Sequence, residues 1–133
     1  MRDLEELLAS QPTLEGFDRL ARQGVPRQLV DELANALGVR IVKLAPLVHT
    51  SSRTLRRYRS DQLLSPDVSE RVLQIVRVFS QSTEVLEGRE KAARWLTGKN
   101  RALNAVPLEL MGTVFGVERV LQILGRIEHT VYS

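Results

Sequence analysis

Apolar residues recur along the chain at intervals of three and four positions, which places them on one face of an α-helix. No stretch of four to eight residues shows the sustained alternation of apolar and polar side chains expected of a half-buried strand. The longest pattern opens with Ser65-Pro66-Asp67, an N-cap, a first-turn proline and a first-turn acid, and it ends near Gly88. We therefore predict an all-α protein with one long central helix.

Shorter helices are predicted on both sides of the central helix. Two of them, over residues 4–9 and 14–23, form an acidic N-terminal piece, and a third spans 26–37 between Pro26 and Gly38. Further helices are expected over 89–96, over 107–113 and from about 117 towards the C-terminus, with a loop over 100–106. Gly116 is expected to end the 107–113 helix with a positive φ angle. The predicted organisation is an N-terminal extension over 1–25, a second region over 26–65 and a third over 66–133.

Between Ile41 and Tyr58 the spacing predicts a helix, a tight turn and a second helix. The small Ala45 lies where the two helices would cross, and Ser51 or Ser52 would cap the second helix. Leu55 and Tyr58 would face inward from it. His49 stands in the turn, where glycine is common, and it must adopt left-handed backbone angles or alter the turn. Pro46 removes one hydrogen bond from the first helix and is expected to shorten it.

The distribution of charge along the chain indicates what this pair of helices could bind. Residues 1–38 hold four Lys and Arg against seven Asp and Glu, residues 39–80 hold eight against three, and residues 81–133 hold seven against six. Of the nineteen cations sixteen are Arg, and there is no acid between residues 50 and 60. Arginine suits bidentate contacts with phosphates and guanine edges, so we predict DNA binding rather than a merely solvated face. The candidate DNA-binding residues are Ser51, Ser52, Arg53, Arg56, Arg57 and Arg59.

Composition excludes several other classes of function. The chain has 133 residues and 15.0 kDa, the size of one folding unit, with no cysteine and two histidines. Disulfides, thiolate zinc sites and cysteine nucleophiles are thereby excluded, and we expect no metal and no cofactor. His129 stands beside Glu128, but consecutive helical residues point about 100° apart and form no catalytic pair. No apolar run approaches a membrane span, and the acidic start is unlike a secretory signal, so we expect a cytoplasmic protein that is not an enzyme.

A set of residues in the C-terminal third resembles a known family. These residues are Trp95-Leu96, Asn100, Ala102-Leu103, Pro107-Leu108, Leu110, Thr113, Gly116, Val120, Leu124 and Arg126-Ile127-Glu128. They resemble the toxin-binding domain of the Xre/MbcA/ParS antitoxins, and with the Arg53-Thr54-Leu55 helix-turn-helix before them the arrangement is similar to the Xre antitoxin of a RES–Xre pair. The resemblance covers roughly residues 26–133. The chain departs from the family pattern at Asn104 and Thr130, where glycine is expected.

The resemblance implies an all-helical antitoxin with no catalysis of its own. Its partner would be a RES-domain toxin that consumes NAD, blocked when the C-terminal region of the antitoxin covers or enters the toxin's active-site cleft. The antitoxin–toxin pair would also repress its own promoter by binding operator DNA. Because helix-turn-helix proteins commonly bind two half-sites as symmetric dimers, we expect a homodimer.

The last eight residues have the chemistry of a docking segment. A site that binds the pyrophosphate of NAD must offer cationic or N–H donors, which Glu128 or the Ser133 carboxylate could satisfy, while Tyr132 could fill the space of a ring. The candidate toxin-binding residues are Arg126, Glu128, His129, Val131, Tyr132 and Ser133. In the alternative interpretation, Ile127 and Val131 complete the packing of the last helix and the remainder is solvated.

Two other classes of protein are weighed against the antitoxin. A stand-alone transcriptional regulator would use the same helix-turn-helix and treat the C-terminal third as a dimerisation or ligand domain. The set of residues from Trp95 to Glu128 distinguishes the two, since a generic regulator has no reason to carry it. An enzyme is disfavoured because the eight glycines are scattered singly and form no phosphate-binding loop.

Overall fold

The computed structural model describes residues 3–132, and for residues 129–132 the backbone alone. Within this part the chain forms eight α-helices and two short 3-10 helices and no β-strand, which confirms the all-α prediction. The elements are α1 (Leu4–Ser10), α2 (Leu14–Gln23), α3 (Arg27–Leu37), α4 (Ile41–Leu44), η1 (Ala45–Val48), α5 (Ser52–Arg56), α6 (Pro66–Leu86), α7 (Arg89–Thr97), η2 (Pro107–Leu110) and α8 (Val114–Tyr132). None of the described helices has the combination of length and apolar character that crossing a membrane requires.

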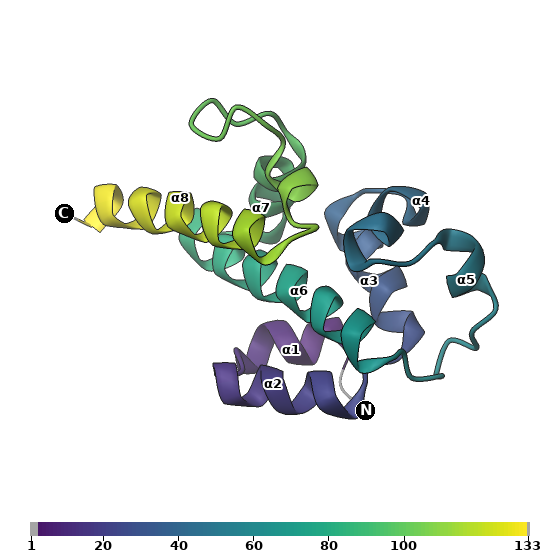
Figure 1. The fold of residues 1–133 in the computed structure, drawn as a ribbon. Coiled ribbons are helices and arrows are strands. Elements are labelled where there is room, and N and C mark those ends of the chain that lie inside the picture. Colours follow the sequence, from purple (N-terminus) through teal and green to yellow (C-terminus); the bar gives the residue numbers. More distant parts are fainter. Residues whose placement is uncertain (1–2, 133) are drawn as a thin grey trace.

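Helix α6 runs through the middle of the molecule and is the predicted central helix (Figure 1). Its start is stabilised as the sequence indicated, since the Val68 N–H donates to Oγ of Ser65 over 3.3 Å. Its 21 residues span about 31 Å. Helices α2, α7 and α8 all pack against it, as does η1. Apolar side chains such as Val72, Val76 and Phe79 are therefore fully buried.

A buried serine ties the beginning of α6 to the junction between α2 and α3. The hydroxyl of Ser69 accepts a hydrogen bond from the Val25 N–H at 2.9 Å and donates one to the Leu64 carbonyl at 3.2 Å. The Leu64 N–H in turn donates to the Val25 carbonyl at 2.8 Å. Gly24 is required here because its φ is +93° and a Cβ atom would lie 2.9 Å from the Leu64 carbonyl oxygen.

The N-terminal helix α1 bridges two other helices. The Arg89 guanidinium at the start of α7 donates two hydrogen bonds to the Glu5 carboxylate, and the Leu4 N–H donates to Glu32 of α3 at 3.2 Å. The hydrogen bond from Arg89 holds the pKa of Glu5 below its ordinary value, and the same bond raises the pKa of Arg89. Exposed pairs of this kind contribute little stability, so α1 is held mainly by the burial of Leu4, Leu7 and Leu8.

The connection between α7 and η2 is a protruding loop (Figure 1). Asn100 and Ala105 form an isolated antiparallel bridge across its base, and Oδ1 of Asn100 accepts from the Leu103 N–H at 3.0 Å. Asn104, which stands where the family pattern has glycine, has a φ of 52°. Asparagine tolerates these left-handed angles better than most residues, so the replacement preserves the turn.

Two expectations about the segment after this loop are wrong. The helix predicted over 107–113 is the shorter 3-10 helix η2, and Gly116 has no positive φ but lies inside α8. Helix α8 begins three residues earlier than predicted because Oγ1 of Thr113 accepts a hydrogen bond from the Gly116 N–H at 3.1 Å. Glycine is needed at this position because a Cβ atom would lie 1.6 Å from the carbonyl oxygen of Leu110.

We expect Gly116→Ala to lower the free energy of unfolding by about 3 kcal/mol or more, since the added methyl group forces α8 away from η2. Chemical denaturation followed by circular dichroism measures this change. Gly125→Ala in the same helix is the matched control, because a Cβ atom there meets nothing within 4 Å. The control should gain about 1 kcal/mol from helix propensity. Equal stability of the two variants would contradict the close approach of Leu110.

Candidate functional site

Of the candidate DNA-binding residues, Ser52, Arg53 and Arg56 lie in α5, which is shorter than predicted, whereas Ser51 precedes the helix and Arg57 and Arg59 follow it. Helix α5 ends at Arg56, so Tyr58 lies beyond it and is half-buried in the following turn rather than on the helix. A helix of five residues is not stable by itself, and its conformation must come from tertiary contacts. Leu55 supplies the main one, as its side chain is 3% exposed and joins the hydrophobic core.

The turn that leads into α5 has one of the two conformations that the sequence left open. The first helix of the pair stops at Leu44 and continues as η1, in agreement with the effect expected of Pro46. His49 adopts φ 63° and ψ 37°, the left-handed region. Oγ of Ser51 then accepts a hydrogen bond from the Thr54 N–H at 3.1 Å and caps α5. The small Ala45 is fully buried, as expected where two helices cross.

The segment that leaves α5 is bonded to the start of α3. The Arg27 N–H donates to the Gln62 carbonyl and the Gln28 N–H donates to the Ser60 carbonyl, both at 2.9 Å. Backbone N–H groups at the start of α3 are thereby paired with the returning chain. Helix α5 is consequently held at its entry by the capped turn and at its exit by this pairing.

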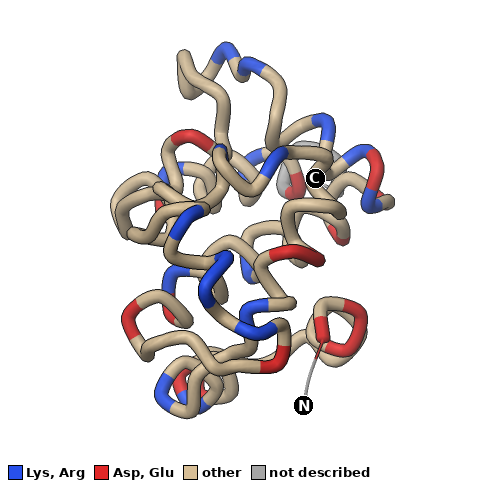
Figure 2. The backbone as a smooth tube through the Cα atoms, turned by 90° about the vertical axis from the view of Figure 1, so that its right-hand side faces the viewer, with Lys and Arg blue, Asp and Glu red and all other residues tan. Residues whose placement is uncertain are grey.

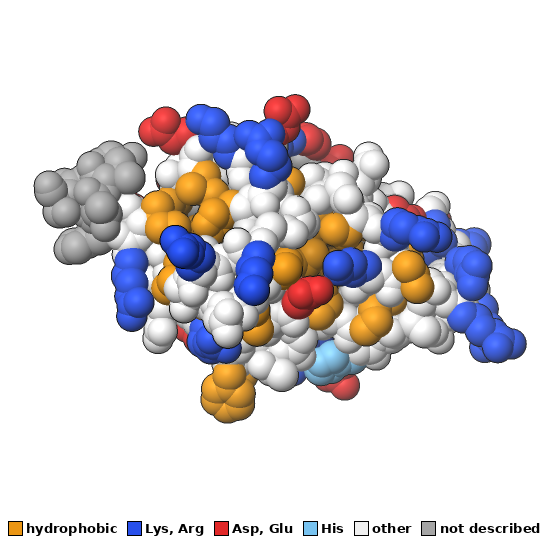
Figure 3. Space-filling model, turned by 90° about the horizontal axis from the view of Figure 1, so that it is seen from above, with side chains coloured by type: hydrophobic (Ala, Val, Ile, Leu, Met, Phe, Trp, Pro, Cys, Tyr) orange, Lys and Arg blue, Asp and Glu red, His pale blue; other side chains and the backbone are white. Residues whose placement is uncertain are grey.

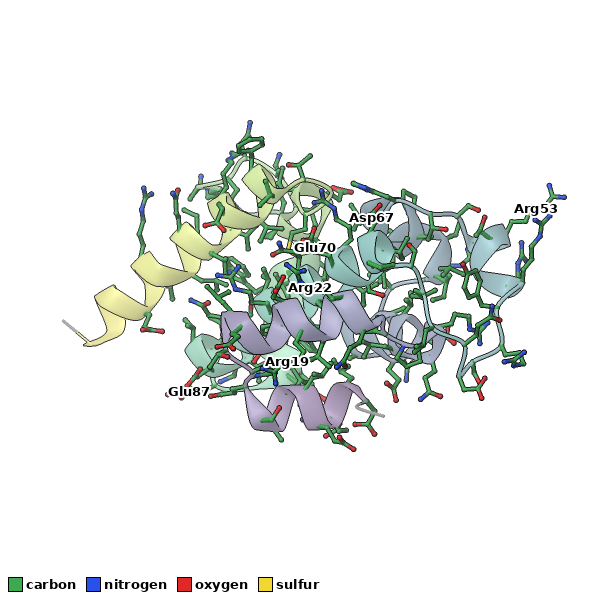
Figure 4. All side chains as sticks on the ribbon, turned by 60° about the horizontal axis from the view of Figure 1, so that its bottom comes forward. Arg19, Arg22, Arg53, Asp67, Glu70 and Glu87 are labelled. Carbon is green, nitrogen blue, oxygen red and sulfur yellow. The ribbon has the colours of Figure 1, made fainter. Side chains whose placement is uncertain are left out.

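The structure gathers the candidate arginines at one end of the molecule. Arg53, Arg56, Arg57 and Arg59 are all exposed, and Arg53 projects outward at the end opposite to Glu87 (Figure 4). Seen from this end, Lys and Arg positions gather across the middle of the view (Figure 2). Arg59 pairs with Asp61 at 3.4 Å, whereas the ion pairs formed within residues 3–128 include none with the other three. Three guanidinium groups are therefore available to an anionic partner.

The two candidate serines differ in their surroundings. Besides accepting from the Thr54 backbone, the Ser51 hydroxyl lies 3.0 Å from Oγ1 of Thr54, to which it donates. Ser52 is half-buried in the first turn of α5. The local role of Ser51 is therefore to shape the start of α5. Any contact of this helix start with a phosphate would also involve the arginines.

The helix pair contacts the C-terminal part of the chain through two side-chain contacts that the sequence did not predict. Nε2 of His49 lies 2.8 Å from the Gly112 carbonyl oxygen, and because a carbonyl can only accept, Nε2 is the donor. Nζ of Lys43 lies 3.6 Å from Oε1 of Glu109. His49 and Gly112 are 63 positions apart, and no local pattern could have linked them. The turn before α5 is thus attached directly to the segment between η2 and α8.

The candidate toxin-binding residues lie at the end of α8. The backbone is helical to Tyr132, and the last turns project beyond the rest of the molecule (Figure 1). Arg126 and Glu128 are exposed. The side chains of His129, Val131 and Tyr132 and the whole of Ser133 lie outside the described residues. Seen from above, the face with α8 carries hydrophobic side chains between Lys and Arg side chains (Figure 3).

The described residues of the two surfaces do not have the arrangement of a metal site. Among the described residues no three His, Cys, Asp or Glu side chains come together in a way that could hold a metal ion. His49 is exposed and bonds to a backbone carbonyl rather than to an acid that would orient it as a base.

Comparison with known protein families gives two matches. Residues 16–77 match the antitoxin Xre-like helix-turn-helix domain, and residues 81–129 match the antitoxin Xre/MbcA/ParS C-terminal toxin-binding domain. No curated protein matches the chain. The first match contains α5 and its arginines, the second contains α7 and most of α8, and the two meet inside α6. The boundaries at residues 25 and 65 stay predictions.

We expect Ser51→Ala to lower the free energy of unfolding by about 1 kcal/mol, because the Thr54 N–H loses its acceptor. Ser52→Ala is the matched control, since Ser52 follows the cap and is already helical. Thermal unfolding monitored by circular dichroism compares the two variants. A smaller effect at position 51 than at position 52 would be inconsistent with the assigned cap.

Proposed function

We propose that this chain, whose two parts match the antitoxin Xre-like helix-turn-helix domain and the antitoxin toxin-binding domain, neutralises a RES-domain toxin that degrades NAD and represses its own operon. The observation that carries the proposal is that the two family matches fall on the two surfaces described above, the arginines of α5 and the projecting end of α8. The protein would act by occupying sites on its partners and would perform no catalysis.

The toxin is proposed to be a RES-domain enzyme because the residues from Trp95 to Glu128, together with the helix-turn-helix, resemble the antitoxin of a RES–Xre pair. The exposed carboxylate of Glu128 supports this proposal. A site for the NAD pyrophosphate holds cations or N–H donors, and a carboxylate presented by a projecting helix can take the place of the dinucleotide there. Tyr132 and Ser133 would complete the blockage of the cleft.

Operator binding is proposed to involve two copies of the chain. Helix-turn-helix proteins place one recognition helix in each of two half-sites about 34 Å apart, which requires a symmetric dimer. In each copy Arg53, Arg56 and Arg57 would contact phosphates or guanine edges. The cap formed by Ser51 and the exit pairing of residues 60–62 would hold these arginines in place.

Deletion of residues 130–133 tests the proposed blockage of the toxin. We expect cells that co-express the RES-domain toxin encoded beside this chain to lose most of their NAD with the truncated antitoxin and to keep it with the full chain. Because the deletion leaves α5 untouched, operator binding by the truncated protein serves as the control for folding. Full protection of NAD by the truncated protein would rule out this role of the tail.

Replacing Arg53, Arg56 and Arg57 with Ala tests the operator surface. We expect retardation of a DNA fragment from the chain's own promoter to be lost, while the helical signal in circular dichroism stays the same. Arg19→Ala/Arg22→Ala/Arg101→Ala removes the same charge from exposed positions outside α5, of which Arg19 and Arg22 are labelled in Figure 4. This control should retain binding. Equal retardation by both triple variants would contradict the assignment of α5.

A further inference from the structure

Helix α8 has one face that the rest of the chain covers and one that it leaves open. Val117, Val120 and Leu124 are fully buried against α6 and η2. The opposite face is exposed, and its residues follow one another at intervals of three and four positions, which keeps them on one side of the helix. They are Phe115, Glu118, Gln122 and Gly125, with Arg126 beside them.

The first residue of this outward face is an exposed aromatic. Phe115 is 78% exposed, more than any other large apolar side chain of the described residues. A single exposed apolar residue is common on protein surfaces and proves nothing alone. Aromatic side chains are also the most frequent anchors of protein interfaces, where they fill pockets of the partner. The position of Phe115 at one end of an exposed helix face is compatible with that role.

The outward face also contains a glycine that the chain itself does not need. Gly125 lies inside α8 without a positive φ, and a Cβ atom there would meet nothing within 4 Å. Glycine in a helix interior is less stable than alanine, so its presence needs a reason. At Gly116 the reason is the close approach of the Leu110 carbonyl, whereas the described structure shows no such reason for Gly125. A partner whose backbone comes close to α8 at this point would supply it.

We propose that the outward face of α8 from Phe115 to Arg126 is the surface on which the toxin docks. Phe115 enters an apolar pocket of the toxin, and Gly125 admits the toxin's backbone. The inference rests on the proposed function, because the match to the toxin-binding domain covers this whole face and identifies the occupant as the toxin. The face is about 16 Å long and leads directly into the C-terminal end proposed to reach the toxin's cleft.

The first test measures the affinity of the purified full chain for the neighbouring RES-domain toxin by calorimetry. We expect Phe115→Ala to weaken binding at least tenfold and to leave the melting temperature of the free antitoxin unchanged. Leu63→Ala is the matched control, since Leu63 is an apolar residue between α5 and α6 that is 47% exposed and lies outside the match to the toxin-binding domain. The control should bind the toxin with the affinity of the unmodified chain.

The second test uses a substitution with two opposite expected effects. Gly125→Ala should raise the melting temperature of the free antitoxin, because alanine favours the helix, and should weaken toxin binding at least tenfold, because the methyl group occupies the space of the toxin's backbone. If Gly125 had only a structural role, Gly125→Ala would not both raise the melting temperature and weaken toxin binding.

The outcomes separate this inference from the proposed function. If the unmodified chain does not bind the toxin, the proposed function itself is contradicted. If it binds and both Phe115→Ala and Gly125→Ala bind equally well, only the docking face is overturned. Light scattering supplies a further outcome: if Phe115→Ala turns a dimer into a monomer and keeps full toxin affinity, a second copy of the chain covers this face and the inference fails.

Discussion

The burial of α6 on most of its sides is the constraint on which both binding surfaces depend. Helices α2, α7 and α8 and the 3-10 helix η1 pack on this one helix, so the hydrophobic core is shared between the two family domains. The match to the helix-turn-helix domain ends at residue 77 and the match to the toxin-binding domain begins at residue 81, both inside α6. A continuous helix therefore joins the two domains.

A second connection reinforces this arrangement on the other side of α6. The hydrogen bond from His49 to Gly112 and the ion pair between Lys43 and Glu109 attach the helix pair to the segment just before α8. Each contact is partly exposed and weak by itself. Together with the shared core, they place the arginines of α5 and the outward face of α8 in a defined relation. At either proposed binding surface a partner would therefore meet a preformed site, and binding would cost this chain little conformational entropy.

The helix that presents the arginines depends most on its surroundings. Five residues cannot sustain a helix in water, and α5 exists because Leu55 is buried, Ser51 caps it and residues 60–62 pair with the start of α3. The projecting end of α8 is the opposite case. It continues a helix of 19 residues whose earlier turns are anchored by Val117, Val120 and Leu124. One surface is a short helix held at both ends and by one buried side chain, and the other is the end of a long helix whose earlier turns are anchored in the core.

The sequence by itself determined the all-α class, the central helix from Pro66 and the grouping of the arginines, and it limited the turn at His49 to two conformations. Each follows from neighbouring residues, through periodicity, capping or the freedom of φ. Only the tertiary structure decided that α5 stops at Arg56, that Gly116 lies against Leu110 inside α8, and that His49 meets Gly112. These depend on backbone groups distant in sequence or across a turn, whose approach is set by packing and leaves no periodic signal in the chain. The exposure of Phe115 could not be predicted for the same reason, since only the folded core shows which apolar side chains stay outside it.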